Sequence, residues 1–399
     1  MSSEEWKKYK LEEVAEIVGG GTPSTVNTDY WGGDIPWLTP RDLSTNKERF
    51  VSRGERNITP LGLENSSAKL LPTGTVLLTT RAPIGYLAIA RNPICTNQGF
   101  KSLIPNNKVV DNLFLYYLLK NNVEYLKSVG VGTTFAEISG GALRQIEFEF
   151  PELSVQHQIA EILSALDDKI ELNRQTNATL EAIAQAIFKE WFVDFNYPGA
   201  TGELVDSPLG PIPKGWQVIP LDQIASFLNG LALQKYPPKP GETPLPVIKI
   251  KELRNGVTES SDLASRSIPE QFKVKNGDLL FSWSGSLEVM FWAGGEGALN
   301  QHLFKVTSDE YPLWFVFLWI KHHLPNFRGI AADKATTMGH IKRKDLTEAL
   351  CLIPDDIAPV ENTFDHLFKL HHQNELENET LESVRENLLP KLMSGEIEV

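Results

Sequence analysis

The sequence predicts a mixed α+β fold in which two similar globular domains are separated by two long antiparallel helices that form a coiled coil. Three observations support this prediction. The chain has 399 residues, more than one hydrophobic core usually supports. Its two halves are similar to each other at a spacing of about 200 residues, which indicates an internal repeat. Each half also ends in a long segment with the residue spacing of a coiled-coil helix.

The internal repeat is carried by matched positions along both halves. The segment Ile35–Leu43 (IPWLTPRDL) aligns without gaps with Leu245–Leu253 (LPVIKIKEL), and the register then shifts by a few residues. Further matched pairs are Trp6 and Trp216, Gly20 and Gly230, Gly74 and Gly277, Asn97-Gln98 and Asn300-Gln301, Thr133-Thr134 and Thr336-Thr337, and Pro151 and Pro354. An internal duplication explains this pattern better than chance.

Two segments, residues 153–195 and 356–399, are predicted to be the long helices. In the first, the residues that recur in alternating steps of four and three are Ile159, Leu163, Leu166, Ile170, Asn173, Asn177, Leu180, Ala184, Ile187 and Trp191. The second segment repeats the same steps, each position 201 residues later, as from Ile159 to Val360 (360 − 159). This spacing predicts a heptad seam in both helices.

Four asparagines occupy matched positions on this seam. In an antiparallel pairing, Asn173 and Asn177 lie opposite Asn374 and Asn378 at the middle of the helices, where their amides can bond to one another. Buried amides in a helix interface fix the register of the pairing, and the geometry implies a pseudo-twofold axis. The alternative is that these side chains face solvent on irregular helices.

The repeat and the helices together predict four domains. Residues 1–152 form a first globular domain, 153–195 a first spacer helix, 196–355 a linker with a second globular domain, and 356–399 a second spacer helix. The linker is the stretch 196–215, which is dense in Pro and Gly.

The formal net charge of −13 counts at first against a nucleic-acid binder, because phosphate contacts are made by Lys and Arg. Much of the acidity is confined to the two predicted helices. Residues 152–192 carry 3 basic and 7 acidic side chains (3 − 7 = −4), and residues 355–399 carry 3 and 11 (3 − 11 = −8). The globular domains are therefore near neutral and can present local basic surfaces.

Several classes of protein are disfavoured by the sequence. There is no apolar run of the roughly 18 residues that a membrane span needs, and the N-terminal sequence is unlike a secretory signal, so we expect a cytoplasmic protein. The two cysteines, Cys95 and Cys351, are in no ligand spacing. We find no phosphate-binding loop, no metal-binding motif and no nucleophile-elbow serine, and we therefore expect no catalytic residue, no cofactor and no metal.

Side chains of the types that read bases or bind phosphates follow predicted strands and loops in both halves. Arg and Lys donate to guanine, Asn and Gln pair with adenine, and basic residues bind phosphates. The candidates in the first half are Thr39, Arg41, Arg81, Gln98, Thr133 and Thr134. Those in the second half are Lys249, Lys251, Ser284, Gln301, Lys334, Thr336, Thr337, Lys342, Arg343 and Lys344. The alternative for each is an ordinary surface residue, and for Gln98 and Gln301 an amide that holds a loop.

The whole chain resembles the specificity subunit of Type I restriction-modification systems. The resemblance is carried by GGGTPSTVNTDYWGGDIPWLTPRDL, NQGF, GTTFAEIS, QHQIAEILSALDDKIELNRQTNATLEAIAQAIFKEWF and the terminal ENLLPKLMSGEI. It implies two target recognition domains that each read half of a bipartite, asymmetric site in double-stranded DNA. It also implies two methyltransferase subunits that bind S-adenosylmethionine, and restriction subunits that use ATP and Mg. The second half departs from the pattern, with NQHLF for NQGF and SWSGSL for TTRAPIG, so that different bases are expected there.

Two other classes of function remain open from the residues alone. One is a single chain that both recognises DNA and transfers a methyl group, against which the missing cofactor and catalytic motifs count. The other is a purely structural coiled-coil protein, which any half-site-specific contact with DNA would exclude.

Overall fold

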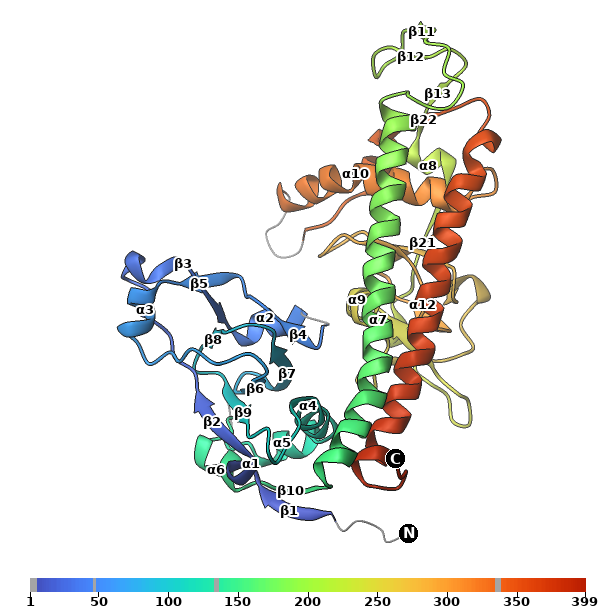
Figure 1. The fold of residues 1–399 in the computed structure, drawn as a ribbon. Helices are drawn as coiled ribbons and strands as arrows, with labels where there is room; N and C mark the ends of the chain where they lie inside the picture. Colours follow the sequence, from blue (N-terminus) through green and yellow to red (C-terminus); the bar gives the residue numbers. More distant parts are fainter. Residues whose placement is uncertain (1–5, 46–47, 133–135, 334–338) are drawn as a thin grey trace. The chain divides into compact units, whose positions relative to one another are not determined.

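The computed structural model describes residues 6–45, 48–132, 136–333 and 339–399. The chain divides into two compact units, each described here by itself: unit 1 comprises Met1–Glu171 and Leu381–Val399, and unit 2 comprises Leu172–Thr380. The first module denotes residues 6–150 of unit 1, and the second module denotes residues 216–353 of unit 2. Each unit contains one module and part of both long helices (Figure 1).

The first module is a set of small sheets covered by short helices. A five-stranded sheet has the order β2-β9-β6-β7-β4, a three-stranded sheet the order β5-β3-β8, and β1 pairs with β10. The strands are β1 Lys7–Lys10, β2 Ala15–Gly19, β3 Trp31–Leu38, β4 Phe50–Val51, β5 Arg56–Ile58, β6 Val76–Thr80, β7 Ile84–Ala90, β8 Cys95–Thr96, β9 Lys101–Pro105 and β10 Glu147–Phe150. The helices are α1 Leu11–Val14, α2 Pro40–Thr45, α3 Pro60–Glu64, α4 Asn112–Asn121, α5 Val123–Val129 and α6 Gly140–Gln145, with the 3-10 turn η1 Thr28–Tyr30.

The second module repeats this plan with fewer paired residues. Two four-stranded sheets have the orders β14-β21-β18-β19 and β16-β15-β20-β17, and β13 pairs with β22. The strands are β13 Gln217–Pro220, β14 Ser226–Asn229, β15 Leu245–Ile248, β16 Leu263–Ala264, β17 Lys273–Val274, β18 Leu279–Ser282, β19 Val289–Phe291, β20 Gly297–Leu299, β21 Leu303–Thr307 and β22 Leu350–Ile353. The helices are α8 Leu221–Ile224, α9 Ile250–Asn255, α10 Leu313–Asp333 and α11 Arg343–Glu348, with the 3-10 turns η3 Leu233–Lys235 and η4 Glu270–Phe272.

Matched backbone contacts support the duplication read from the sequence. The N–H of Leu11 donates to Ile146 O at 2.9 Å, and that of Leu221 donates to Ala349 O at 2.8 Å. The glycines of the two predicted turns, Gly74 and Gly277, have φ angles of 85° and 90°. Both positions therefore need a residue that adopts the left-handed region without strain.

The segment predicted as a linker is partly ordered by pairing and by aromatic contact. Within it, β11 (Leu204–Val205) pairs with β12 (Ile212–Pro213) in an antiparallel hairpin. Tyr197 packs on Trp216 with ring centroids 5.2 Å apart. The prolines and glycines thus shape a hairpin within the predicted linker.

The two long helices are α7 (Leu153–Phe188), which continues into the π-helical turn η2 (Lys189–Val193), and α12 (Ala358–Met393). Within unit 2 their segments run side by side and antiparallel (Figure 1). Asn173 Nδ2 donates to Asn378 Oδ1 at 3.0 Å, and Asn374 Nδ2 donates to Asn177 Oδ1 at 2.8 Å. All four amides are buried, unlike in the solvent-facing alternative.

Two glutamates of α12 complete this amide cluster. Asn177 Nδ2 also donates to Glu375 Oε1 at 2.7 Å, and Asn173 Nδ2 donates to Glu377 Oε2 at 2.8 Å. The amide nitrogens of Asn173 and Asn177 therefore each have two partners. Asn173 Nδ2 donates to a carboxylate and to an amide oxygen, and Asn177 Nδ2 donates to a carboxylate and to the backbone oxygen of His371. Burying a polar group that keeps its hydrogen bonds costs the folded protein little stability, whereas burying one without a partner costs on the order of 1–3 kcal/mol.

In unit 1 the helix pair is held by a buried charge cluster. Asp167 of α7 accepts hydrogen bonds from Arg385 Nη1 of α12 and from the Tyr117 hydroxyl of α4, both at 2.6 Å. Arg49, which precedes β4, donates to the Tyr117 hydroxyl at 3.0 Å and to Asp168 Oδ1 at 2.6 Å. This cluster therefore ties the first module to the segments of both helices that belong to unit 1.

The protonation of this cluster follows from its partners. Burial alone would raise the pKa of Asp167, but the charges of Lys120 and Arg385 and the hydrogen bonds to its carboxylate hold that pKa below the ordinary value. Burial lowers the pKa of Lys120 to about 8. Asp167 is therefore ionised in the folded protein at neutral pH.

We predict that Asp167→Asn lowers the free energy of unfolding by on the order of 3 kcal/mol, because it leaves Arg385 buried beside a neutral group. The folded-state pKa of Asp167 lies below its unfolded value of about 3.9. Its stabilisation is therefore complete above that pH and is lost as the pH falls through the folded-state pKa. Urea denaturation at pH 7 and across the acidic range measures both effects.

The matched control is Asp168→Asn, since the Asp168 side chain is 65% exposed and its ion pair with Arg49 is worth at most about 1 kcal/mol. Equal losses from the two substitutions would contradict the role given to Asp167.

For the amide cluster we predict that Asn374→Leu costs about 1–3 kcal/mol, because Asn177 Oδ1 loses its donor while remaining buried. The double variant Asn177→Leu with Asn374→Leu should lose less stability than the sum of the two single variants, since the hydrogen bond between the two amides can be lost only once. A double-mutant cycle by urea denaturation checks this, with the exposed Asn387→Leu on the same helix as the control. Additive effects of the two substitutions would show that the amides do not act as a pair.

Candidate nucleic-acid interface

In the first module, the ends of two parallel strands bring together residues that are about 60 positions apart in the sequence. β3 pairs with β8 in parallel, with Leu38 opposite Thr96. Thr39 and Asn97 follow at the same edge, and the N–H of Asn97 donates to Leu38 O at 2.8 Å. The candidate residue Gln98 is thereby placed beside the start of α2, which carries Arg41.

The loop after β2 lies against the same strand ends. A Cβ at Gly20 would stand 2.0 Å from Asn97 O, so only glycine fits there. Beyond it, Thr22 Oγ1 donates to Gln98 Oε1 at 2.5 Å. The amide of Gln98 is thus both exposed and held, which leaves its nitrogen as the group able to meet a ligand.

Arg81 joins this edge from β6. The N–H of Thr80 donates to Gly99 O at 2.8 Å. Arg81 follows Thr80 and Gln98 precedes Gly99, so this bond brings Arg81 close to Gln98. Its guanidinium forms a long ion pair with Glu137 at 3.8 Å and remains half exposed. Thr39, Arg41, Arg81 and Gln98 therefore surround one edge of the first module, and we name this set the first strand-end cluster.

The second module reproduces the framework. β15 pairs with β20 in parallel, and the N–H of Asn300 donates to Ile248 O at 3.2 Å. A Cβ at Gly230 would stand 2.2 Å from Asn300 O, as at the matched glycine of the first module. The N–H of Trp283 donates to His302 O at 3.3 Å, the counterpart of the Thr80 bond. Lys249, Lys251, Ser284 and Gln301 meet here, and we name them the second strand-end cluster.

Side chains differ where the frameworks agree. Ser284 is only 3% exposed, and its hydroxyl is 3.0 Å from Nδ1 of His302. Trp283 Nε1 donates to Asn229 Oδ1 at 2.9 Å and to Gln301 O at 3.1 Å. Among these side chains, Trp283 and His302 were absent from the predicted set, although the change from NQGF to NQHLF was the signal that could have identified His302.

Lysines of the second cluster are held by short side-chain contacts. Lys249 Nζ forms an ion pair with Asp262, and Lys251 Nζ donates to Ser260 Oγ at 3.0 Å. The hydrogen bond and charge of Lys249 lower the pKa of the Asp262 carboxyl. Lys249, Asp262 and Asn300 also line a pocket of about 220 Å³ at this edge.

The basic residues near α11 have separate environments. Arg343 Nη2 donates to Phe227 O at 3.0 Å, and its guanidinium lies 5.6 Å from the centroid of the Phe304 ring, so it helps to hold the module together. Lys342 and Lys344 are exposed, and Lys344 pairs with Glu348 at 3.0 Å. The remaining candidates Thr133, Thr134, Lys334, Thr336 and Thr337 lie outside the described residues.

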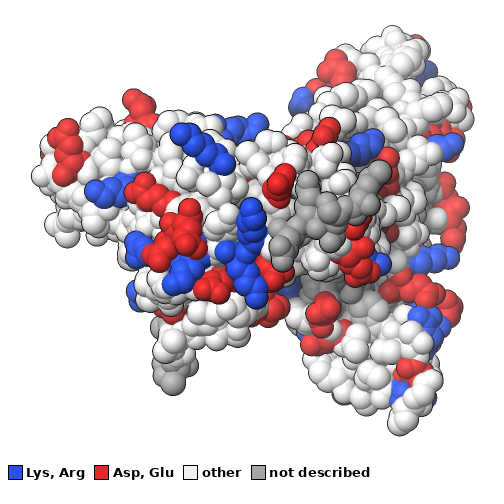
Figure 2. Space-filling view, turned by 60° about the horizontal axis from the view of Figure 1, so that its bottom comes forward, with Lys and Arg blue, Asp and Glu red and all other residues white. Residues whose placement is uncertain are grey.

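Charge on the surface is mixed. On the face drawn in Figure 2, lysine and arginine side chains lie among aspartate and glutamate side chains. A DNA contact on such a surface depends on local groups of basic residues more than on net charge.

The part of the chain that the structure describes also bears on metal binding and on membrane insertion. No group of three or more His, Cys, Asp or Glu residues there is placed to hold a metal ion. No helix there is long and apolar enough to cross a membrane.

Comparisons with known proteins agree with the duplicated architecture. The family model described as the Type I restriction modification DNA specificity domain matches the chain twice, over residues 3–182 and 213–386. The chain is 36% identical to the Type I restriction enzyme MjaIX specificity subunit of Methanocaldococcus jannaschii, over 99% of the chain and 94% of that protein. It is 23% identical to the HindI specificity subunit of Haemophilus influenzae, over 98% and 100%.

Among solved structures, the chain is similar to the S subunit of a Type I restriction-modification system from M. genitalium. The TM-score is 0.57 at 14% identity, over 98% of this chain and 97% of that one. This likeness shows a shared fold.

The framework makes a prediction about Gly20. We expect Gly20→Ala to lower the free energy of unfolding by about 3 kcal/mol, because the added methyl group would meet backbone oxygens that cannot move without breaking β8. Gly19→Ala is the matched control, since its nearest neighbour would be Lys101 Cδ at 3.9 Å. Thermal and urea denaturation compare the two variants, and similar stabilities would contradict the close approach at Gly20.

Proposed function

This chain belongs to the family of Type I restriction-modification DNA specificity subunits, and on that premise we propose that each of its modules reads one half of a bipartite, asymmetric DNA site. The chain is the DNA-recognition subunit of such a system and is not itself the catalyst. The observation that carries the proposal is the repeated strand-end framework with different side chains on it. A common backbone framework that carries different side chains can recognise two half-sites of different sequence.

In the first module we assign base contacts to the first strand-end cluster. The exposed amide of Gln98 can pair with adenine, and Arg81 can donate to guanine once its long ion pair with Glu137 opens. Arg41 is exposed on the same edge and can bind a base or a phosphate. The Thr39 hydroxyl donates to Asp42 Oδ2 at 2.7 Å, so we assign Thr39 to shaping the start of α2.

In the second module the contacts differ in chemistry. Lys251 and Gln301 can reach bases or phosphates from the strand ends, and Lys342 and Lys344 can bind phosphates. Ser284 is buried against His302, so we assign it to positioning that imidazole beside Gln301. The candidates Thr133, Thr134, Lys334, Thr336 and Thr337 stay predictions from the sequence alone.

We further propose the assembly in which this subunit works. The domains 1–152 and 196–355 act as target recognition domains, with 153–195 and 356–399 as spacer helices whose four asparagines set the register. Two methyltransferase subunits with S-adenosylmethionine and restriction subunits with ATP and Mg dock on it in the cytoplasm. Support for the docking comes from the exposed acidic positions along α7 and α12.

A domain exchange tests the modular assignment. We predict that replacing residues 1–152 by the corresponding domain of another family member changes one half of the methylated site and leaves the other half unchanged. The measurement is mapping of methylated adenines in the genome of cells that contain the hybrid together with the methyltransferase subunit.

The reciprocal exchange of residues 196–355 is the control and should change only the other half. If one exchange altered both halves while the complex still assembled and methylated DNA, independent reading by the two modules would be wrong.

A further inference from the structure

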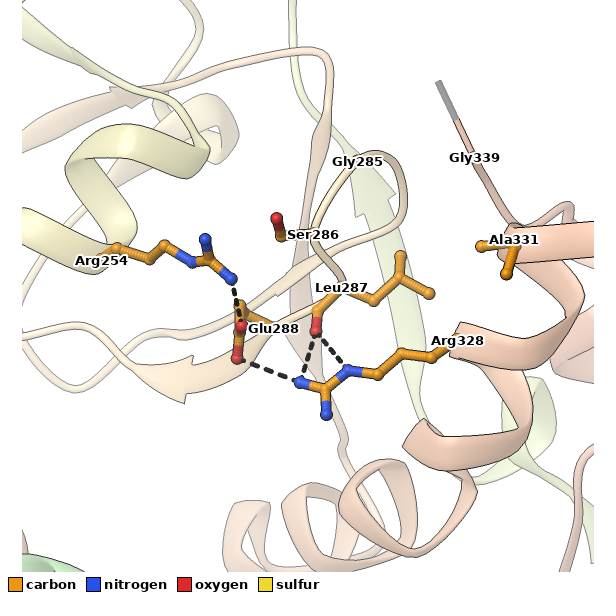
Figure 3. Close-up of a pocket in the computed structure, with 9 residues that line it drawn as sticks. Arg254, Gly285, Ser286, Leu287, Glu288, Arg328, Ala331 and Gly339 are labelled. Atoms are coloured by element: carbon orange, nitrogen blue, oxygen red, sulfur yellow. Dashed lines mark hydrogen bonds and ion pairs between the residues drawn. The ribbon is translucent and has the colours of Figure 1, made fainter. Parts of the chain in front are cut away.

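We propose that a pocket in the second module binds one phosphodiester of the DNA backbone beside the half-site which that module reads. The arginine pocket, as we name it, is lined chiefly by Arg254, Ser286, Leu287, Glu288, Arg328 and Ala331 and has a volume of about 450 Å³ (Figure 3). The proposal rests on the proposed function and specifies the chemistry of one contact.

Two guanidinium groups meet in this pocket on a single carboxylate. Arg254 reaches it from α9 and Arg328 from α10 (Figure 3). Glu288 Oε1 is 2.5 Å from Arg254 Nη2, and Glu288 Oε2 is 3.4 Å from Arg328 Nη2. Two guanidinium groups thus share one carboxylate in this pocket, and a phosphodiester can join them through charge-assisted hydrogen bonds.

The arginine side chains are held in place and remain accessible. Arg328 donates from Nε and Nη2 to Leu287 O at 3.2 and 3.0 Å, which fixes the plane of its guanidinium. The side chains of Arg254 and Arg328 are 45% and 52% exposed, so that a ligand can reach them. These contacts of Arg328 use Nε and Nη2, so its Nη1 group is the one that can donate to a phosphate oxygen.

The pocket adjoins the second strand-end cluster. The loop after β18 that supplies Ser286 and Leu287 begins at Trp283 and Ser284. That loop is anchored by the N–H of Gly285, which donates to Gly339 O at 2.8 Å. Helix α9, which supplies Arg254, carries Lys251 one turn earlier. A backbone phosphate bound here would therefore lie next to the groups assigned to base reading, where phosphate contacts set the register of a protein on the duplex.

The walls of the pocket suit a nucleotide backbone. Leu287 and Ala331, beside the arginines, are only 2% and 5% exposed, and the exposed Ala332 is a further apolar residue of the lining (Figure 3). A deoxyribose can contact Ala332 while the phosphate faces the guanidinium groups. Ser286 is exposed and lines the pocket, and its hydroxyl can donate a hydrogen bond to a phosphate oxygen.

The first module has different residues at the matched positions. Arg254 aligns with Ser44 at the spacing of the ungapped segment (254 − 44 = 210, as 245 − 35 = 210). Arg328 aligns with Tyr125 at the spacing of the asparagines (328 − 125 = 203, as 300 − 97 = 203). The phosphate contact is therefore expected on only one side of the bipartite site.

The test is a methylphosphonate scan of DNA binding by the full chain with its methyltransferase subunit. The probe is a duplex that carries the mapped target site, in which one backbone linkage at a time is made neutral. With the wild-type chain, one linkage beside the half-site of the second module should be sensitive to neutralisation. With Arg328→Ala or Arg254→Ala, affinity for the unmodified duplex should fall about tenfold and the same linkage should become insensitive.

Two further measurements separate a phosphate contact from a loss of structure. Each arginine substitution should lower the slope of log affinity against log salt by about one, without changing which half-site sequence is preferred. Glu288→Gln should tighten binding, because the competing carboxylate charge is removed while the side chain keeps its size. Arg266→Ala is the matched control, since Arg266 pairs with Glu296 at 2.6 Å in the same module and does not line the pocket.

Several outcomes would overturn the inference. One is a scan in which the sensitive linkages of wild type and variants are the same, and another is a loss of affinity in Arg266→Ala as large as in Arg328→Ala. Stabilisation of the wild-type chain by inorganic phosphate with an unchanged scan would indicate a site for free anions instead. If the wild-type complex failed to bind the mapped site at all, the proposed function itself would be wrong.

Discussion

The structure depends on the need to pair polar groups buried between α7 and α12. In unit 2, Asn173 and Asn177 meet Asn378 and Asn374, and a shift by one helical turn would leave only one pair of these amides facing each other. In unit 1, the same helices enclose Asp167, whose charge needs Arg385 opposite it. Apolar seams tolerate sliding, because one leucine replaces another at little cost. Amides and charges do not, and they therefore fix the antiparallel register of the helix segments within each unit.

The modules show how one framework can serve two recognition tasks. Both modules have the same close approach between the glycine that follows β2 or β14 and the asparagine that follows β8 or β20, as at Gly20 with Asn97 and Gly230 with Asn300. These contacts leave no room for change, since any side chain at either glycine would meet backbone oxygen. The side chains at the strand ends are free of this constraint. The first module has Gln98 there and the second has Trp283 and His302, so these side chains differ while the backbone framework is the same.

The acidic charge that counted against DNA binding has in part a structural use. Asp167 neutralises arginine in a buried cluster, and Glu375 and Glu377 accept hydrogen bonds from the seam amides. Each of these carboxylates has a hydrogen-bond donor within the helix pair, so this part of the acidic charge serves to hold the helices together. Net charge is therefore a weak guide to the partners of this chain, and the local pairing of each charged group matters more.

The sequence by itself determined the duplication, the long helices and the opposition of the four asparagines. These features are periodic, and the 3.5-residue period of a paired helix is set by neighbours along the chain. The same periodicity could not reveal the cluster around Asp167, because Arg49 and Tyr117 come from elements far away in the sequence. Only the tertiary structure showed that Ser284 is buried, that Arg343 holds Phe227 and that Arg254 meets Arg328 on Glu288. The role of a charged or polar side chain depends on which distant groups the fold brings within about 3 Å of it, and local sequence carries no record of that distance.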